Sequence, residues 1–147
     1  MISRPLNRQT LIVQNKISDR DKLHEFLIEY VESHDIPGDT YNDLRLVIEE
    51  AFTNIINHAY TDNKSHTVTV ELNNTESAIV ITFTDTGIEF DPLTDCGELD
   101  EKADHGEGGM GMHIIKSLTD SQEYHRINQH NVFTVTKLYT KKNRTPE

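Results

Sequence analysis

The sequence predicts an α/β fold, more narrowly an α+β two-layer sandwich in which helices cover one face of a mostly antiparallel, mixed sheet. Two kinds of periodicity support this prediction, because some segments alternate like strands and others repeat apolar residues at helical spacing. Their predicted order is strand, two helices, two strands, a loop, one helix and two strands. Neighbouring strands joined by short turns favour antiparallel pairing, and amphipathic helices need an apolar sheet face to cover. We expect a single domain over residues 1–147.

The first half of the chain is expected to supply one strand and two helices. Residues 9–15 contain β-branched residues and predict the first strand. Ser18 or Asp19 is expected to cap the first helix. This helix is expected to end at residues 34–39, which contain a proline and a glycine. A second helix is predicted from about residue 40 to residue 60. Its predicted buried stripe consists of Leu44, Val47, Ile48, Ala51, Phe52, Ile55 and Ile56.

The second half is expected to supply two hairpins that flank a lid and a helix. Residues 67–72 and 78–83 read as strands joined by a tight turn. Residues 92–109 show no periodicity, and a loop of that length in a small domain is usually a functional lid or disordered. The remaining predicted elements are a helix over 110–118 and a closing hairpin with strands over 123–127 and 132–139.

Composition and charge narrow the class of protein. The 14 Lys and Arg residues against 25 Asp and Glu give a net charge of −11, which argues against a nucleic-acid partner. No apolar run approaches the roughly 20 residues of a membrane-spanning helix, so we expect no membrane partner. The N-terminus has no secretion-signal layout, and the single cysteine, Cys96, agrees with a reducing compartment. We therefore expect a cytoplasmic protein.

Polar side chains gather on one face of the predicted second helix. At about 100° per residue, Glu50, Asn54, Asn57 and His58 fall within about 100° of arc, opposite the apolar stripe. An asparagine oxygen suits Mg²⁺, which is usually held by one or two protein groups together with phosphate oxygens and waters. A glutamate one turn away has the chemistry to accept a proton from an attacking hydroxyl. Alone, this pattern also describes an ordinary solvated helix face.

An Asp-x-Gly pattern follows a predicted buried strand. Asp85 ends that strand, where an unpaired carboxylate is costly, so we expect a dedicated hydrogen-bond donor such as an adenine amino group. Gly87 has no Cβ and therefore permits a flat ring to approach the backbone closely. A plain turn after a strand explains the pattern equally well when it stands alone.

A glycine-dense segment precedes the predicted third helix. Gly106, Gly108, Gly109 and Gly111 lead into that helix, whose first backbone N–H groups lack intrahelical partners and suit an anion. The spacing superficially suggests a dinucleotide fingerprint, but an acidic loop precedes it where that motif needs a strand. A glycine-rich hinge remains the plainer alternative.

Taken together, the three patterns resemble the N, G1 and G2 boxes of the GHKL (histidine kinase-like) ATPase superfamily. Within it, the chain resembles the anti-sigma-factor serine kinases (RsbW-like and SpoIIAB-like), whose fold is the Bergerat ATP-binding fold. The residues that carry the resemblance are Glu50-Ala51-Phe52-Thr53-Asn54, His58-Ala59-Tyr60, Asp85-Thr86-Gly87-Ile88-Glu89-Phe90-Asp91-Pro92 and Gly108-Gly109-Met110-Gly111-Met112 with Ile115 and Leu118. The resemblance spans nearly the whole chain.

The resemblance implies ATP and Mg²⁺ as cofactors and gives roles to individual residues. Asn54 would hold Mg²⁺, and Glu50 would be the base that takes the proton from a serine hydroxyl. Asp85 would bind the adenine amino group, with Gly87 beside the ring. The G2 residues that would shape the lid hinge and the phosphate cradle are Gly106, Gly108, Gly109, Met110 and Gly111. Asn57 and His58 would either reach the phosphates or order the base.

The resemblance also implies partners. The leading hypothesis is an ATP-dependent protein serine kinase that phosphorylates a STAS-type anti-sigma-factor antagonist and also binds a second regulator such as a sigma factor. A homodimer is implied as well. The alternative is an ATP-gated binding protein that sequesters a sigma factor with little or no phosphotransfer. Glu50 favours the kinase, because a binder that does no catalysis has no evident need for an acid at that position.

Two further readings are weaker. A sensor histidine kinase needs a substrate histidine on a helical dimerisation hairpin, whereas His24 and His34 lie in one short predicted helix followed by Pro37. A zinc site fails because no pair among the histidines and Cys96 has ligand spacing beside another pair.

Overall fold

The fold is a single antiparallel sheet with helices on one face. The structure, a computed structural model, describes residues 7–95 and 109–140. The helices are α1 (Arg20–Ser33), α2 (Gly38–Asn54), α3 (Pro92–Asp95) and α4 (Gly109–Leu118), with short turns η1 (Ile17–Asp19) and η2 (Ile55–Ala59). The strands are β1 (Gln9–Gln14), β2 (Thr67–Asn74), β3 (Ala78–Asp85), β4 (Ser121–Ile127) and β5 (His130–Leu138).

The strands lie in the order β1-β2-β3-β5-β4, and each of the four pairings is antiparallel. The predicted two-layer sandwich is therefore confirmed. In the β3–β5 pairing Asp85 lies opposite Asn131, so the end of one central strand adjoins the start of the other. Because successive side chains point to opposite faces, both residues lie on the side that the helices cover.

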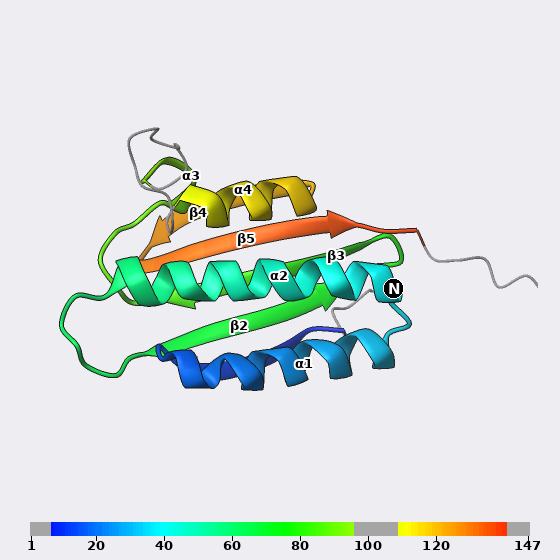
Figure 1. Ribbon diagram of the computed structural model, residues 1–147, viewed down its shortest axis with the longest axis horizontal. Coiled ribbons are helices and arrows are strands. Elements are labelled where there is room, and N and C mark those ends of the chain that lie inside the picture. The colour runs from blue at the N-terminus through cyan, green and yellow to red at the C-terminus, as the bar shows by residue number, and fades with distance from the viewer. Residues whose placement is uncertain (1–6, 96–108, 141–147) are drawn as a thin grey trace, which may run out of the picture.

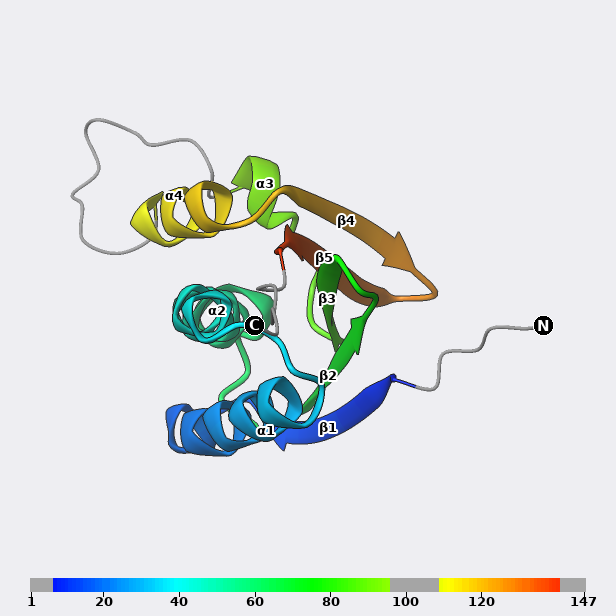
Figure 2. The ribbon, with the colours of Figure 1, turned by 90° about the vertical axis from the view of Figure 1, so that its right-hand side faces the viewer.

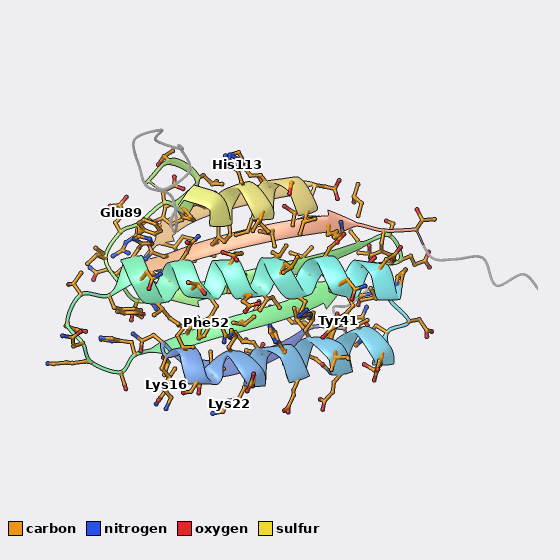
Figure 3. All side chains as sticks on the ribbon, in the orientation of Figure 1. Lys16, Lys22, Tyr41, Phe52, Glu89 and His113 are labelled. Carbon is orange, nitrogen blue, oxygen red and sulfur yellow. The ribbon has the colours of Figure 1, made fainter. Side chains whose placement is uncertain are left out.

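Helices α1, α2 and α4 lie side by side on one face of the sheet, and no described element covers the other (Figures 1 and 2). The core lies between the two layers, and Phe52 of α2, labelled in Figure 3, is fully buried in it. Fully buried core side chains include Leu23, Leu27, Leu44, Val47, Ile48 and Phe52 from the helices and Val68, Val70, Leu72, Ile79, Ile81, Phe83 and Val135 from the sheet. The predicted stripe of the second helix is confirmed except at Ile56, which is half-buried.

The second helix does not remain α-helical to its end. Regular α2 stops at Asn54, and residues 55–59 form the π-helical turn η2. A π turn holds more residues per turn than an α-helix, so positions beyond it rotate away from the face that regular spacing gives. The prediction of one α-helix over 40–60 is therefore wrong in its last turn.

Other predicted boundaries shift by a few residues. The hairpin strands β2 and β3 are each longer than predicted, and residues 92–95 of the predicted lid form the short helix α3. Asp19 precedes α1, but its carboxylate accepts the Gln14 N–H at 2.8 Å rather than capping the helix. Helix α4 begins at Gly109, one residue earlier than predicted, and Gly111 lies inside it.

Candidate functional site

A pocket opens at the end of the sheet, beneath the C-terminal part of α2. It holds about 310 Å³ of space, part of which is open to solvent. Its lining residues are Ala51, Asn54, Ile55, Asp85, Phe90, Pro92, Tyr124, Asn131 and Phe133. The lining is mostly apolar with a few polar groups, which is the usual make-up of a small-molecule site.

Asp85 ends β3 and lines this pocket. Its side chain is buried, and Oδ1 accepts hydrogen bonds from the Gly87 N–H at 2.8 Å and from Asn131 Nδ2 at 2.9 Å. Burial raises the pKa of the Asp85 carboxyl, and the two hydrogen bonds oppose that rise. Among the described residues none donates to Oδ2. The dedicated donor that the sequence predicted for Asp85 is thus, for Oδ1, a protein group, while Oδ2 is left without a donor from the described residues.

The loop after Asp85 packs closely against η2. A Cβ built on Gly87 would lie 2.1 Å from the backbone oxygen of Ala59, so only glycine fits there. The next residue, Ile88, donates its N–H to the same Ala59 oxygen at 2.8 Å. Gly87 is thus needed for contact with η2, a more immediate requirement than the close approach of a ligand ring that the sequence suggested.

Side chains from the β4–β5 hairpin hold this loop from the other side. Asn131 Nδ2 donates to the Ile88 carbonyl at 2.8 Å, and Arg126 donates to the Gly87 carbonyl at 2.9 Å. Tyr124 donates its hydroxyl proton to Asn131 Oδ1. None of these three hairpin residues was singled out from the sequence, and their contacts follow from the β3–β5 pairing rather than from any local motif.

Glu50 faces α4 across the gap between the two helices. A Cβ built on Gly111 would lie 2.8 Å from Glu50 Oε1 and 3.8 Å from Asn54 Oδ1. Burial raises the pKa of the Glu50 carboxyl, and the neighbouring charge of Glu49 raises it further. A carboxylate with a raised pKa is a stronger base than an exposed one, which suits proton acceptance near neutral pH.

Asn54 lies one turn further along the same helix and is buried, with 8% of its surface exposed. Its Nδ2 is one of two buried side-chain atoms without a hydrogen-bond partner among the described residues, the other being His24 Nε2. A buried amide without a partner is costly unless a ligand supplies one. The described residues hold no group of three or more His, Cys, Asp or Glu that could bind a metal alone. One amide oxygen completed by phosphate oxygens and waters nevertheless fits Mg²⁺.

Asn57 and His58, the two remaining polar residues of the predicted face, lie in different surroundings. Asn57 is exposed on η2. His58 stacks on Phe90, with ring centroids 4.9 Å apart and ring planes 13° apart. Since Phe90 lines the pocket, His58 supports its wall from behind.

The predicted G2 residues are only partly described. Gly106 and Gly108 lie outside the described residues, as does most of the predicted lid. Gly109 and Met110 begin α4, and Gly111 follows them against Glu50. Lys137 of β5 fixes the far end of α4, because it donates to the Leu118 carbonyl at 2.9 Å and pairs with Asp43 of α2 at 3.1 Å. This link helps to place α4 beside α2.

Comparison with known proteins decides the family. Residues 15–137 match the family model described as histidine kinase-like ATPase domain. The chain belongs to the histidine kinase-like ATPase family. The match includes α2, the loop after β3 and α4, so the pocket and the Glu50–Gly111 contact lie within the histidine kinase-like domain.

Curated relatives share the same domain. The serine-protein kinase RsbW of Bacillus subtilis is 28% identical over 66% of this chain and 62% of its own length. The serine-protein kinase RsbW of Oceanobacillus iheyensis is 31% identical over 69% of this chain and 66% of its own length. The chain thus spans a little under two thirds of the relatives it matches.

A solved structure supports the fold. The RsbU and RsbW domains of Rv1364c from Mycobacterium tuberculosis match 88% of this chain and 32% of that chain, with a TM-score of 0.58 and 15% identity.

Across the described ranges, every helix falls short of the length and apolar character that crossing a membrane requires.

Proposed function

We propose that this histidine kinase-like domain binds ATP in the pocket at Asp85 and transfers its terminal phosphoryl group to a serine of a partner protein. The observation that carries the proposal is the carboxylate of Glu50 beside Gly111, one helical turn from the buried Asn54, whose Nδ2 has no hydrogen-bond partner among the described residues. Asn54 and Asp85 line one pocket, and Glu50 lies next to it on the side of Gly111. The names of the curated relatives support the same activity.

Asp85 and Asn54 would have different roles in holding ATP. Asp85 Oδ2 would accept a hydrogen bond from the adenine amino group, while Phe90 and Phe133 enclose the ring. Asn54 would hold Mg²⁺ through its side-chain oxygen. When bound, Mg²⁺–ATP supplies the phosphoryl group and the positive charge that offsets the negative charge of the transfer.

Glu50 would act as the base. It would accept the proton of the serine hydroxyl as the serine oxygen forms its bond to the γ-phosphorus and the bond from that phosphorus to the β–γ bridging oxygen breaks. Phosphoserine, ADP and a protonated Glu50 are the balanced products. The raised pKa of Glu50 makes its carboxylate a stronger proton acceptor than that of an exposed glutamate.

The partners follow from the family resemblance. We propose a STAS-type anti-sigma-factor antagonist as the substrate, a sigma factor as the second partner, and a homodimer as the assembly. Each is taken from the resemblance of the nucleotide boxes to those of anti-sigma-factor kinases, and the relatives named RsbW agree with it.

The test separates binding from transfer. Thermal unfolding with and without Mg²⁺–ATP is expected to show a clear rise in Tm for the wild type, which Asn54→Ala and Asp85→Asn largely abolish. Glu50→Gln is expected to keep the Tm shift but to lose phosphotransfer to STAS-type proteins of the source organism, measured with labelled ATP and phosphosite mass spectrometry. Glu49→Gln, on the adjacent residue, is the matched control. It is expected to keep both the Tm shift with Mg²⁺–ATP and phosphotransfer.

Three results would contradict the proposal. No Tm shift at millimolar ATP would remove the nucleotide site. Loss of both binding and transfer in Glu50→Gln would make Glu50 a structural residue. A wild type that binds ATP and a sigma factor but transfers no phosphate would support the ATP-gated binder instead.

A further inference from the structure

We propose that Asn131 is a positioning residue for nucleobase recognition: it fixes the orientation of Asp85 and the path of the loop at residues 86–90 without itself touching the base. This inference rests on the proposed function, because it assumes that a nucleotide binds at Asp85. The inference adds to that function because it names the residue that holds Asp85, the proposed acceptor for the adenine amino group, in a fixed orientation.

The amide of Asn131 is fully occupied by the protein. Nδ2 has two hydrogens, and they go to Asp85 Oδ1 at 2.9 Å and to the Ile88 carbonyl at 2.8 Å. Oδ1 accepts from the Phe90 N–H at 3.2 Å, from Arg126 at 3.0 Å and from the Tyr124 hydroxyl. The side chain is 4% exposed. No hydrogen is left for a ligand, so Asn131 acts through the residues that it holds.

The loop that it holds has little backbone support of its own. Across residues 86–90 the backbone–backbone hydrogen bond runs from the Ile88 N–H to Ala59. The other backbone contacts of this segment go to side chains, namely Asp85, Tyr60, Arg126 and Asn131. Among the described residues, Asn131 alone contacts Asp85, which precedes the loop, as well as Ile88 and Phe90, its middle and its end. Its amide therefore sets both the acceptor and the pocket wall at Phe90.

The contact at Asp85 also fixes which oxygen faces the base. Asn131 and the Gly87 N–H both donate to Oδ1, so rotation of the carboxylate would break two hydrogen bonds. Oδ2 is left for the ligand. Without the Asn131 donor, the carboxylate loses one of these restraints and the buried charge loses a partner, and nucleotide binding would have to restore the orientation.

The substitution Asn131→Asp gives a readout that a merely structural role would not give. It replaces the donor with a second carboxyl beside Asp85 Oδ1, and two carboxyls at hydrogen-bonding distance share one proton. While that proton is present it replaces the Nδ2 hydrogen that goes to Asp85, so Asp85 keeps its orientation. The hydrogen bond to the Ile88 carbonyl is absent from this variant at every pH and so does not contribute to a change with pH. Once the proton is lost at higher pH, the two charges repel and the orientation is lost. The charged groups that act on Asp85 from the hairpin are Arg126 and His130, and both are unchanged in the variant.

The experiment measures Mg²⁺–ATP binding by calorimetry between about pH 6 and about pH 9 for wild type, Asn131→Asp and Asn128→Asp. Asn128 lies exposed in the β4–β5 turn, so Asn128→Asp adds the same charge to the same hairpin without touching Asp85. Groups that are common to all variants affect each Kd alike, so the ratio of Kd to that of the wild type is the readout. We expect this ratio for Asn131→Asp to stay within about threefold near pH 6 and to rise at least about tenfold near pH 9.

A ratio that does not change with pH in a folded Asn131→Asp protein would overturn the inference, as would an equal rise in Asn128→Asp. If Asn131→Asp does not fold, the same measurement on Arg126→Met tests the inference instead. Arg126 is exposed, and its removal takes away the donor to the Gly87 carbonyl and one of the donors to Asn131 Oδ1. Its Kd is expected to rise about three- to tenfold, and an unchanged Kd overturns the inference. A wild type that does not bind ATP overturns the proposed function itself, which is a distinct result.

Discussion

Glu50 and Gly111 are in such close contact that any side chain at residue 111 would meet the Glu50 carboxyl group. A Cβ at position 111 would lie 2.8 Å from Glu50 Oε1. The atom in the way is the end of a flexible side chain, so the helices can stay packed while the carboxylate moves. The contact therefore couples the sequence of the G2 box to the position of the proposed base.

Gly111→Ala is expected to separate activity from stability. Alanine favours the helix by about 1 kcal/mol, which offsets much of the cost of moving Glu50, so the free energy of unfolding should change by less than about 1 kcal/mol. Phosphotransfer is expected to fall at least about tenfold, because a displaced base is misaligned with the serine hydroxyl. Urea unfolding and single-turnover transfer measure the two quantities. Figure 3 shows His113 pointing away from α2, so His113→Ala is a control on the same helix. Unchanged transfer in Gly111→Ala would mean that the position of Glu50 does not matter.

Gly87→Ala is expected to behave in the opposite way. The new Cβ would lie 2.1 Å from the Ala59 backbone oxygen, and backbone cannot move aside as a side chain can. We expect a loss of at least about 3 kcal/mol of folding stability, together with loss of nucleotide binding, measured by urea unfolding and by the Tm shift with ATP. Gly38→Ala is the matched control, because its Cβ would meet nothing within 4 Å and alanine should stabilise the start of α2 by about 0.5 to 1 kcal/mol. Equal stability of the two variants would contradict the packing argument.

Much of the fold could be predicted because burial leaves a periodic trace in the sequence. The β2 strand alternates buried and partly exposed residues, and the apolar stripe of α2 follows helical spacing. The π turn after Asn54 left no such trace, because it depends on a shift in backbone hydrogen bonding rather than on side-chain type. Regular helical spacing therefore does not give the positions of Asn57 and His58, whereas Glu50 and Asn54 both lie beside Gly111 as regular spacing predicts.

The candidate site could be predicted only where its residues belong to local motifs. Asp85 and Gly87 stand together in the sequence, and the structure places both at the pocket loop. Asn131 is 46 residues away from Asp85 and reaches it through the β3–β5 register. The exposed pattern of β4 gives little indication that Arg126 holds this loop. A hairpin prediction gives neither the strand order nor the register, so these residues could be found only in the structure.

Asp85→Asn is expected to remove nucleotide binding without loss of stability. Burial raises the pKa of Asp85 in the folded state, so folding favours the protonated form. That stabilisation is fully present below the unfolded-state pKa, about 4, and is lost as pH rises through the folded-state pKa. At pH 7 the neutral asparagine should therefore leave the urea midpoint equal to or higher than that of the wild type, and this difference should shrink below about pH 4. A strongly lowered midpoint at pH 7 would show that the ionised carboxylate stabilises the fold.

The pH dependence of transfer should report on Glu50. A base must be ionised, so kcat/KM is expected to fall as pH drops through the pKa of Glu50, which burial raises above that of an ordinary glutamate. Glu49→Gln removes the nearby charge that contributes to this rise and should move the acid limb of the profile to lower pH. Glu50→Gln should abolish the limb together with most of the activity. A limb that stays in place in Glu49→Gln would assign it to another group.

The β4–β5 turn offers a way to stabilise the protein without affecting the site. Asn128 and Gln129 both have positive φ, 48° and 67°, and form a two-residue turn between strands. Such turns favour Asn-Gly, because glycine adopts this conformation without strain, whereas a glutamine there pays a steric cost of about 1 kcal/mol. Gln129→Gly is therefore expected to raise the free energy of unfolding by about 0.5 to 1 kcal/mol in urea denaturation and to leave the Kd for ATP unchanged. A destabilised variant would mean that the gain in unfolded-state entropy outweighs the relief of strain. A weakened Kd would mean that the turn, as well as Asn131, controls the loop at Asp85.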